Sequence, residues 1–394
     1  MKKLVIQFLF VLTLLGNSLL AQTDSIPPGI IINYIPGSTG KYIGSPSICI
    51  LPNGDYIASH DEFGPKSTEY KSAQTLIFKS SDKGKTWSKI SQINGQFWSN
   101  LFVIKGELYI MGTNKAHGNV VLRKSIDNGK TWTNPYNADN GLILEGEYHT
   151  APTPLLVYKG RVWRAVEYAT AESDKWGERY SAVMLSAPVK SDLLKARNWT
   201  RSNHVGYDKT FLDGNFKAWL EGNAVVGRNG EILNLLRVHI PPTFDEYTAL
   251  MKVSRNGKKL TFNKEDFYKM PGASKKFTIR YDDKSQMYWT IVNYIPDTYK
   301  GKANPDRIRN FVAVATSTNL REWKVNKILF YHPDNKKHGF QYIDWVVEGE
   351  DIIFVSRTAY DDKEGGANDY HNANYMTFHR INNFKDLSRL SVKE

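Results

Sequence analysis

The chain has 394 residues, a formal net charge of +12 and 13% aromatic residues, a length that suits one large all-β domain or two ordinary ones. Its single cysteine, Cys49, excludes an intrachain disulfide framework and a cysteine–histidine zinc set. The lysines are scattered singly rather than gathered in basic blocks, so the charge favours an acidic glycan as partner over nucleic acid.

The first residues have the pattern of an export signal. MKK is a basic start, VIQFLFVLTLLG is an apolar stretch too short to cross a bilayer, and SLLAQ places a small residue before a cut. We therefore expect a signal peptide at 1–21 and a periplasmic or secreted protein. No cysteine stands at the cut to carry a lipid, and no later apolar run reaches membrane length, so we expect no membrane anchor.

Residues 22–394 carry a repeated strand–turn–strand pattern, and each hairpin is followed by a third strand such as TLIF or FVAVAT. Repeats of this size, with several short strands each, are typical of a β-propeller. We expect a single domain, because no linker interrupts the repeats, and a monomer. We count six units, and seven if the N-terminal stretch and the C-terminal tail add one. The hairpins are 47–60, 101–112, 154–167, 223–238, 277–292 and 344–357.

An octapeptide of the form S-x-D-x-G-x-T-W occurs at 80–87 and at 125–132, with degenerate versions at 254–262 and 317–323. Its Asp and Gly predict a tight turn between two strands, with the Trp packed beneath it. The octapeptide is an Asp-box, and the chain resembles the Asp-box propeller superfamily that includes sialidases. This resemblance supports the fold rather than a function.

The sialidase function itself is disfavoured by the sequence. A sialidase holds its substrate carboxylate with three arginines, the first of them ahead of the first Asp-box. Here that region reads NYIPGSTGKYIGSPSI, and the first arginine of the chain is Arg123.

Polar residues beside the inner hairpins are the candidates for chemistry, because inner strands of a propeller converge on the central axis, where pockets form. They are Ser59, His60, Asp61, His149, Thr150, Arg164, Glu167, Tyr168, Glu221, Asn223, Arg237, His239, Tyr281, Tyr294, Asp344, Arg357, His371 and Asn372.

These side chains suit an elimination on a uronic acid better than other chemistries. The sequence has no HExxH motif and no nucleophile elbow, and it places no acid pair for glycoside hydrolysis. An arginine can neutralise a carboxylate and acidify the C5 proton, a histidine or tyrosine can remove that proton, and another acid can protonate the departing O4.

Four segments carry a more specific resemblance: 42–64, 147–154 (EYHTAPTP), 220–238 (LEGNAVVGRNGEILNLLRV) and 339–381, with its DYHNANYMTFHRI. They are similar to a family of exported Bacteroidetes propellers that act on rhamnose-α-1,4-glucuronate ends of arabinogalactan and gum arabic. That family was first described as rhamnosidases and is now grouped with polysaccharide lyases. Propeller ulvan lyases are more distant relatives.

The resemblance implies seven blades and assigns roles to matching positions. His149 matches a proton-transfer histidine, and Arg237 matches the arginine that neutralises the carboxylate. The family often has a second histidine about twenty residues on, where this chain reads VEYAT, so Tyr168 takes that place. His60 is the nearest match to a histidine on the opposite propeller face. A central calcium is associated with the family, and the reaction itself requires no cofactor.

The sequence thus predicts an all-β, seven-bladed or six-bladed propeller that removes terminal rhamnose from the glucuronate ends of an acidic plant polysaccharide by β-elimination. Two alternatives stay open: an α-L-rhamnosidase acting on the same linkage, and a non-catalytic glycan-binding propeller. The predicted catalytic residues are His149, Arg237 and Tyr168, and the predicted substrate-binding residues are Arg164, His60, His239, Asn223, Arg357 and His371.

Overall fold

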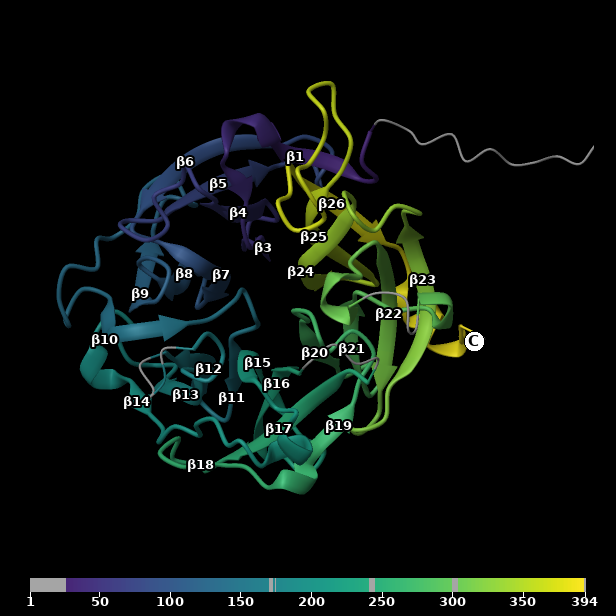
Figure 1. Cartoon of the computed structure of the whole chain (residues 1–394). Helices are drawn as coiled ribbons and strands as arrows, with labels where there is room; N and C mark the ends of the chain where they lie inside the picture. Colours follow the sequence, from purple (N-terminus) through teal and green to yellow (C-terminus); the bar gives the residue numbers. More distant parts are fainter. Residues whose placement is uncertain (1–25, 170–172, 174, 241–244, 300–303, 393–394) are drawn as a thin grey trace, which may run out of the picture.

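The structure is a computed structural model that describes residues 26–169, 173, 175–240, 245–299 and 304–392. The expected signal peptide at 1–21 lies outside these residues. The described residues form an all-β ring of sheets around a central axis (Figure 1). None of their helices is long and apolar enough to cross a membrane.

The strands fall into five sheets, and the eight-stranded sheet contains two successive runs, so the described strands make six antiparallel units. Unit 1 is β2 (Tyr42–Ile43), β3 (Ser47–Ile50), β4 (Tyr56–Phe63), β5 (Gln74–Ser80) and β6 (Ser88–Asn94); unit 2 is β7 (Phe97–Ile104), β8 (Glu107–Thr113), β9 (Gly118–Ser125) and β10 (Leu142–His149). Unit 3 is β11 (Leu156–Tyr158), β12 (Arg161–Tyr168), β13 (Ser181–Pro188) and β14 (Thr200–Arg201); unit 4 is β15 (Ala218–Val226), β16 (Ile232–His239), β17 (Tyr247–Val253), β18 (Leu260–Thr261) and β19 (Phe267–Lys269). Unit 5 is β20 (Ile279–Asp282), β21 (Met287–Val292), β22 (Phe311–Ser317) and β23 (Lys324–Tyr331); unit 6 is β24 (Gly339–Glu348), β25 (Asp351–Ala359), β26 (Tyr375–Ile381) and β1 (Ile30–Tyr34).

Short 3₁₀ helices occupy some of the connections. They are η1 (Gly37–Thr39), η2 (Ala196–Asn198), η3 (Phe211–Gly214), η4 (Lys264–Asp266), η5 (Asp297–Tyr299), η6 (Pro305–Arg307) and η7 (Phe384–Arg389).

The two ends of the described chain close the ring in one sheet. β1 pairs antiparallel with β26, with Ile30 opposite Phe378 and Tyr34 opposite Tyr375. The N-terminal strand therefore completes unit 6 instead of adding a unit, and the seventh blade implied by the resemblance is not confirmed. Backbone hydrogen bonds between first and last strands fasten the ring without a disulfide.

The two octapeptides form the same turn, between β5 and β6 in unit 1 and between β9 and β10 in unit 2. In 80–87, the Asp82 carboxylate accepts hydrogen bonds from the Thr86 amide at 2.9 Å and hydroxyl at 2.6 Å. The Trp87 indole donates to the Gly84 carbonyl at 3.1 Å, and Gly84 has φ of +86°. The equivalent contacts recur in 125–132. The predicted tight turn, with its Trp packed beneath, is thus present in both copies.

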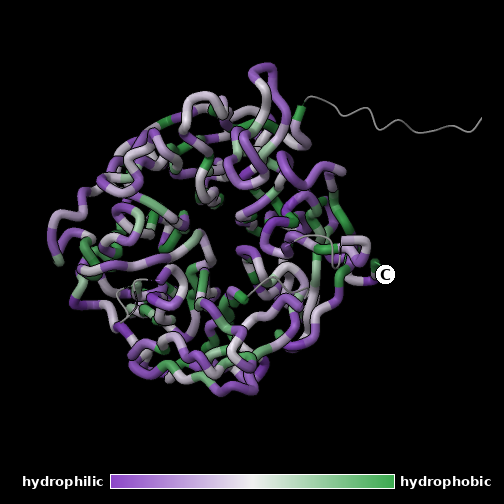
Figure 2. The backbone as a smooth tube through the Cα atoms, viewed as in Figure 1, coloured by the Kyte–Doolittle hydropathy of each residue, from purple (hydrophilic) through white to green (hydrophobic). Residues whose placement is uncertain are grey.

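Hydrophobic residues lie mainly along the strands and hydrophilic ones along the connecting loops (Figure 2). Four tryptophans, Trp163, Trp219, Trp289 and Trp345, are almost completely buried in the clusters between sheets. Burying a large aromatic side chain is worth roughly 1.5–3 kcal/mol, so these contacts hold neighbouring sheets together.

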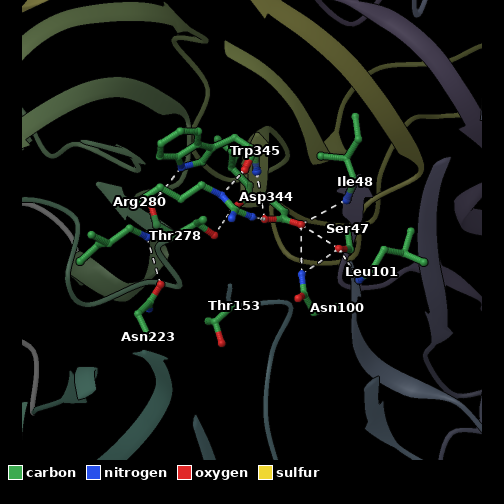
Figure 3. Close-up of polar contacts among 12 residues, drawn as sticks. Ser47, Ile48, Asn100, Leu101, Thr153, Asn223, Thr278, Arg280, Asp344 and Trp345 are labelled. Carbon is green, nitrogen blue, oxygen red and sulfur yellow. Dashed lines mark hydrogen bonds and ion pairs between the residues drawn. The ribbon is translucent and has the colours of Figure 1, made fainter. Parts of the chain in front are cut away.

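Polar side chains tie neighbouring inner strands together at the axis (Figure 3). The Asp344 carboxylate accepts hydrogen bonds from the Ser47 hydroxyl at 2.7 Å and the Ile48 amide at 3.1 Å, which joins unit 6 to unit 1. The Asn223 side chain accepts from the Ile279 amide at 3.0 Å, which joins unit 4 to unit 5. These residues are completely buried or nearly so, and they hold the inner strands in a fixed arrangement around the pocket.

Candidate active site

A pocket of about 280 Å³ is lined by residues of units 1, 2, 3 and 6, close to the lower end of the size range of small-ligand sites. Its titratable and aromatic lining distinguishes it from the rest of the surface. The lining includes Asp61, Phe63, Glu69, Tyr70, Trp98, His117, His149, Trp176, Tyr180, Tyr342, Arg357 and His371.

A larger hollow of about 870 Å³ lies at the outer edge of the ring, beside β1 and β26. Its two acids are already paired: Glu348 contacts both Lys83 and Arg380, and Asp351 contacts Arg380. The smaller pocket is the better candidate for chemistry, because it combines buried titratable groups with an unpaired cation.

The second strands of four units end at the pocket level with charged residues. Asp61 (β4), Glu167 (β12), Arg237 (β16) and Arg357 (β25) are all buried. Three of them occupy equivalent positions around the axis. In each of the three units, a buried polar residue of the inner strand (Ser47, Asn223 or Asp344) pairs with a residue of the next strand. The charged residue (Asp61, Arg237 or Arg357) follows that partner by two positions. The expectation that the ends of inner hairpins bring charged side chains together is met here.

Bulges in three first strands present further side chains at this level. Trp98, Glu221 and Tyr342 have φ of +49°, +52° and +54°, and each lies in a register shift of its strand. Left-handed backbone at non-glycine residues costs about 1–3 kcal/mol and is concentrated at functional sites. Two of these residues, Trp98 and Tyr342, line the pocket.

His149 is oriented by a buried carboxylate. Its Nδ1 lies 2.8 Å from Oε2 of the completely buried Glu167, whose Oε1 accepts the Gly222 amide at 3.1 Å. An ionised carboxylate can only accept, so Nδ1 carries the proton and Nε2 keeps its lone pair. Among the described residues nothing forms a hydrogen bond with Nε2. The ring is packed by Trp98 and Tyr180, with centroids 4.6 and 4.9 Å away. His149 therefore has the arrangement of a general base.

A second histidine and a tyrosine stand beside His149. His117 lies 6.3 Å from it between ring centroids, and the His117 Nε2 is 2.7 Å from the Tyr180 hydroxyl. Burial, together with the nearby His149, lowers the pKa of His117 to about 4, so its ring is neutral. Burial raises the pKa of Tyr180 above its ordinary value, so the phenol is protonated. Tyr180 is thus a proton donor next to a potential base.

Tyr168, predicted to assist His149, faces elsewhere. Its ring packs 5.3 Å from Tyr148, and the Arg201 guanidinium lies 5.1 Å over it. In β12 it follows Glu167, and successive side chains of a strand point to opposite faces. Tyr168 is not among the residues that line the pocket.

Arg357 is the cation that lines the pocket. Its guanidinium lies 4.3 Å from the Phe63 ring and 5.0 Å from the Tyr342 ring, and its Nε donates to the His371 carbonyl at 3.2 Å. Burial lowers its pKa to about 10, so it stays charged at neutral pH. Across the described part of the chain, no carboxylate lies within ion-pair distance of it. The pocket therefore offers a positive charge that makes no direct ion pair with an acid of the described chain.

Arg237, predicted to neutralise the substrate, is already neutralised by the protein. Its Nη1 lies 3.0 Å from Oε2 of Glu221, and both side chains are buried. Burial acts to raise the pKa of Glu221, but the charge of Arg237 and its hydrogen bond to Glu221 act against it, and that pKa is held below its ordinary value. Arg237 is absent from the pocket lining, and it fixes Glu221 at the bulge in β15.

Two acids also line the pocket, a pair that the sequence did not place. Burial raises the pKa of Asp61 to about 6, although its carboxylate accepts the Ser45 and Trp98 amides at 2.6 and 3.0 Å. Burial raises the pKa of Glu69 as well, and the charge of Asp61 adds to that shift.

Two predicted substrate-binding residues are buried inside the protein. His60 is completely buried, with Nε2 2.9 Å from the Asn33 amide nitrogen and its ring stacked 5.6 Å from Phe78. Arg164 is completely buried and donates to the Thr153 and Ala151 carbonyls at 2.7 and 2.6 Å. Neither lines the pocket, because His60 is held between β1 and Phe78 and Arg164 is held by backbone carbonyls of its own unit.

The remaining predicted residues divide between rim, axis and pocket. His239 is partly exposed, 3.0 Å from Asp306, and its ring lies 5.3 Å from that of the pocket residue Trp176. Asn223 is the axial tie described above. His371 lines the pocket beside Arg357, as predicted.

The described axial residues do not fit the calcium associated with the resembled family. Asp344 is the one carboxylate among the residues labelled in Figure 3, and its oxygens already accept hydrogen bonds from Ser47, Ile48 and Trp345. Arg280 lies 3.6 Å from it. Calcium takes six to eight oxygen ligands, whereas this carboxylate is surrounded by donors.

Known structures share the fold. No protein-family model matches the chain, and no curated protein matches it. An α-L-arabinanase of Penicillium chrysogenum, solved with arabinobiose, is 16% identical with a TM-score of 0.55, over 92% of this chain and 98% of its own. An α-L-arabinofuranosidase of Fusarium graminearum, in complex with an iminosugar inhibitor, is 14% identical with a TM-score of 0.56, over 93% and 99%. A Trypanosoma rangeli sialidase is 12% identical with a TM-score of 0.52, over 88% of this chain and 56% of its own. At these identities the likeness shows the fold alone: a β-propeller, here with a central pocket of buried titratable side chains.

Proposed function

We propose that the protein is an exported carbohydrate lyase that removes terminal rhamnose from rhamnose-α-1,4-glucuronate ends of an acidic plant polysaccharide. The observation that carries the proposal is the meeting of two groups in one pocket. His149 presents a free Nε2 supported by Glu167, and Arg357 presents a positive charge with no acid partner among the described residues. A base beside a carboxylate-binding cation is what elimination on a uronate requires.

The reaction can be assigned to this chain's residues with every atom accounted for. Arg357 binds the glucuronate carboxylate and stabilises the charge that develops as the C5–H bond breaks. His149 Nε2 takes the C5 proton, and Glu167 stabilises the imidazolium that forms. The C4–O4 bond breaks as a C4=C5 double bond forms, and Tyr180 gives its proton to O4 of the departing rhamnose. Arg357 and Tyr180 thus take the roles that the sequence assigned to Arg237 and Tyr168.

A glycoside hydrolase is the second candidate, and one observation favours it. Asp61 and Glu69 share the pocket, and both have raised pKa values. Retaining and inverting glycosidases use two carboxyl groups, one of them kept protonated as a general acid by its environment. In that case free rhamnose and a saturated glucuronate would be the products.

The test incubates the mature protein with rhamnose-capped arabinogalactan and follows free rhamnose together with ultraviolet absorbance of the conjugated uronate. The lyase predicts that both rise in step; rhamnose without absorbance indicates the hydrolase. Neither signal, with retained glycan binding, indicates a non-catalytic propeller.

Paired variants locate the site within that assay. Tyr180→Phe is expected to lower kcat by about 10²-fold or more, the contribution of a proton-transfer group, whereas Tyr168→Phe leaves kcat unchanged. His149→Ala is expected to remove activity, and the exposed His204→Ala serves as its control. Equal effects of the two tyrosine variants would contradict the assignment.

A further inference from the structure

A cluster of metal-ligand side chains lies outside the pocket, where two connections of the ring meet. His332 and His338 belong to the connection between β23 and β24, and Asp361 lies in the connection between β25 and β26. One ligand atom from each of the three residues falls within 4.8 Å of the other two. Both histidines are buried, with 6% and 4% of their surfaces exposed, and Asp361 is partly exposed. The cluster thus has two imidazoles inside and a carboxylate toward solvent.

The two imidazoles leave polar atoms unsatisfied. The Nε2 atoms of His332 and His338 are buried and form no hydrogen bond with the described residues. His338 Nε2 lies 3.3 Å from Oδ2 of Asp361, and the two rings stack with centroids 3.5 Å apart. A buried polar atom without a hydrogen bond costs about 1–3 kcal/mol, and such atoms in a native structure call for an explanation. A cation can satisfy both nitrogens if the stacked rings, whose planes are 17° apart, turn so that both Nε2 lone pairs point to it.

Asp334 sets the orientation of both rings. Its Oδ2 lies 3.0 Å from His338 Nδ1, which must therefore carry the proton and leave the Nε2 lone pair free. His332 Nδ1 faces the backbone of the same residue, 3.1 Å from its amide and 3.4 Å from its carbonyl. The amide contact is the shorter of the two and makes Nδ1 the acceptor, so a metal binds at Nε2 only in the tautomer in which Nδ1 donates to the Asp334 carbonyl. A carboxylate or carbonyl behind each histidine is the usual arrangement around protein metal ions.

We propose that His332, His338 and Asp361 bind a divalent transition-metal ion, with Zn²⁺ the best match. Two imidazoles and one carboxylate are ligands typical of zinc, and solvent at the open side can complete a tetrahedral set. Neither Asp361 nor Asp334 lines the pocket, so the metal site supplies no group to the proposed reaction.

The ion would hold the two connections together. They already meet through the Tyr370 amide, which donates to the Lys336 carbonyl at 2.8 Å. The second connection also carries His371, whose carbonyl accepts from Arg357 in the pocket. A metal at Asp361 therefore anchors the segment that positions Arg357, and metal removal is expected to lower thermal stability.

The test uses Zn²⁺ alone, titrated by calorimetry into untagged mature protein stripped with EDTA. We expect one equivalent to bind, and Co²⁺ to give the absorption of a tetrahedral complex. His332→Gln is expected to abolish binding, and Asp361→Asn to weaken it at least tenfold. Asp334→Asn is expected to weaken it about 10- to 100-fold, as loss of a supporting partner does. His204→Gln, at an exposed histidine, is the control and should bind normally.

Two results would overturn the proposal: wild-type protein that binds no Zn²⁺, or binding that survives Asp361→Asn and His332→Gln as it does His204→Gln. Asp361 is partly exposed, so its variant keeps the test valid if the buried-histidine variant fails to fold. Because the readout is metal binding, it does not depend on the identity of the glycan.

Discussion

Glu167→Gln isolates the part of the mechanism that depends on one buried charge. The substitution keeps the shape of the side chain and can still accept the Gly222 amide, but it removes the negative charge 2.8 Å from His149 Nδ1. Glu167 is completely buried and does not line the pocket, so it cannot contact substrate directly. The expected consequence is a loss of kcat with little change in KM.

The magnitude follows from the charge that His149 acquires. Two opposite charges about 4 Å apart interact by about 4 kcal/mol at the effective dielectric constant of a protein site. Because about 1.4 kcal/mol corresponds to a factor of ten, the loss in kcat should be about 10³-fold. The assay is the initial rate of uronate absorbance at saturating substrate. Glu107→Gln, which changes a carboxylate at the start of β8 that does not line the pocket, is the matched control.

A folded Glu167→Gln protein with kcat within about threefold of wild type would refute this reasoning, since proton-transfer groups contribute about 10²–10⁴. It would show that His149 does not become charged during the reaction. A loss confined to KM would likewise contradict the orienting role of Glu167.

Further predictions concern the two arginines and one buried acid. Arg357→Met should lower kcat/KM about 10- to 100-fold on the uronate, the worth of a hydrogen bond to a charged group, and should have little effect on the methyl-esterified substrate; equal losses on both would contradict a carboxylate contact. Arg237→Met should instead lower the free energy of unfolding by about 3–5 kcal/mol, measured by urea denaturation, because Glu221 loses its buried partner; unchanged stability would contradict the pairing. The pKa of Asp61 is raised from 3.8 to about 6 on folding. The free energy of unfolding therefore includes a contribution from Asp61 that is fully present below pH 4 and is lost as the pH rises through 6. The total loss is about 3 kcal/mol. Asp61→Asn should remove that part of the pH dependence between pH 4 and pH 7, and an identical dependence in both proteins would show that Asp61 does not titrate in this range.

Much of the fold could be predicted from local patterns. The Asp, Gly and Trp of 80–87 encode a turn through their own hydrogen bonds, and alternating hairpins encode paired strands, so six units were visible in the sequence. The closure by β1 was not visible, because the pairing of Ile30 with Phe378 joins residues at opposite ends of the chain. A short strand a few residues after the expected signal peptide carries no local sign of its partner, and the seventh blade implied by the resemblance is not confirmed by the described strands.

The sequence predicts a pocket residue correctly where its place at the end of an inner strand is enough to bring it to the pocket. His149, Arg357 and His371 lie at such ends and line the pocket. Trp98 and Tyr342 reach the pocket through bulges in their strands, and the sequence does not mark these bulges. Each of the two stands two residues before a buried polar residue at the axis, Asn100 or Asp344.

Other misses have different physical causes. His117 and Tyr180 come from turns beside third strands, outside the inner hairpins. His60 and Tyr168 do not line the pocket because strand alternation turns neighbours to opposite faces: Asp61 lines the pocket and Glu167 contacts the pocket residue His149.

The most direct test of the central claim is the mass of the uronate product released by the wild-type protein from a rhamnose-capped glucuronate oligosaccharide. Elimination at the pocket of His149 and Arg357 predicts an unsaturated uronate, lighter by one water than the product of hydrolysis. A saturated glucuronate of full mass would contradict the account and assign the pocket to hydrolysis by Asp61 and Glu69.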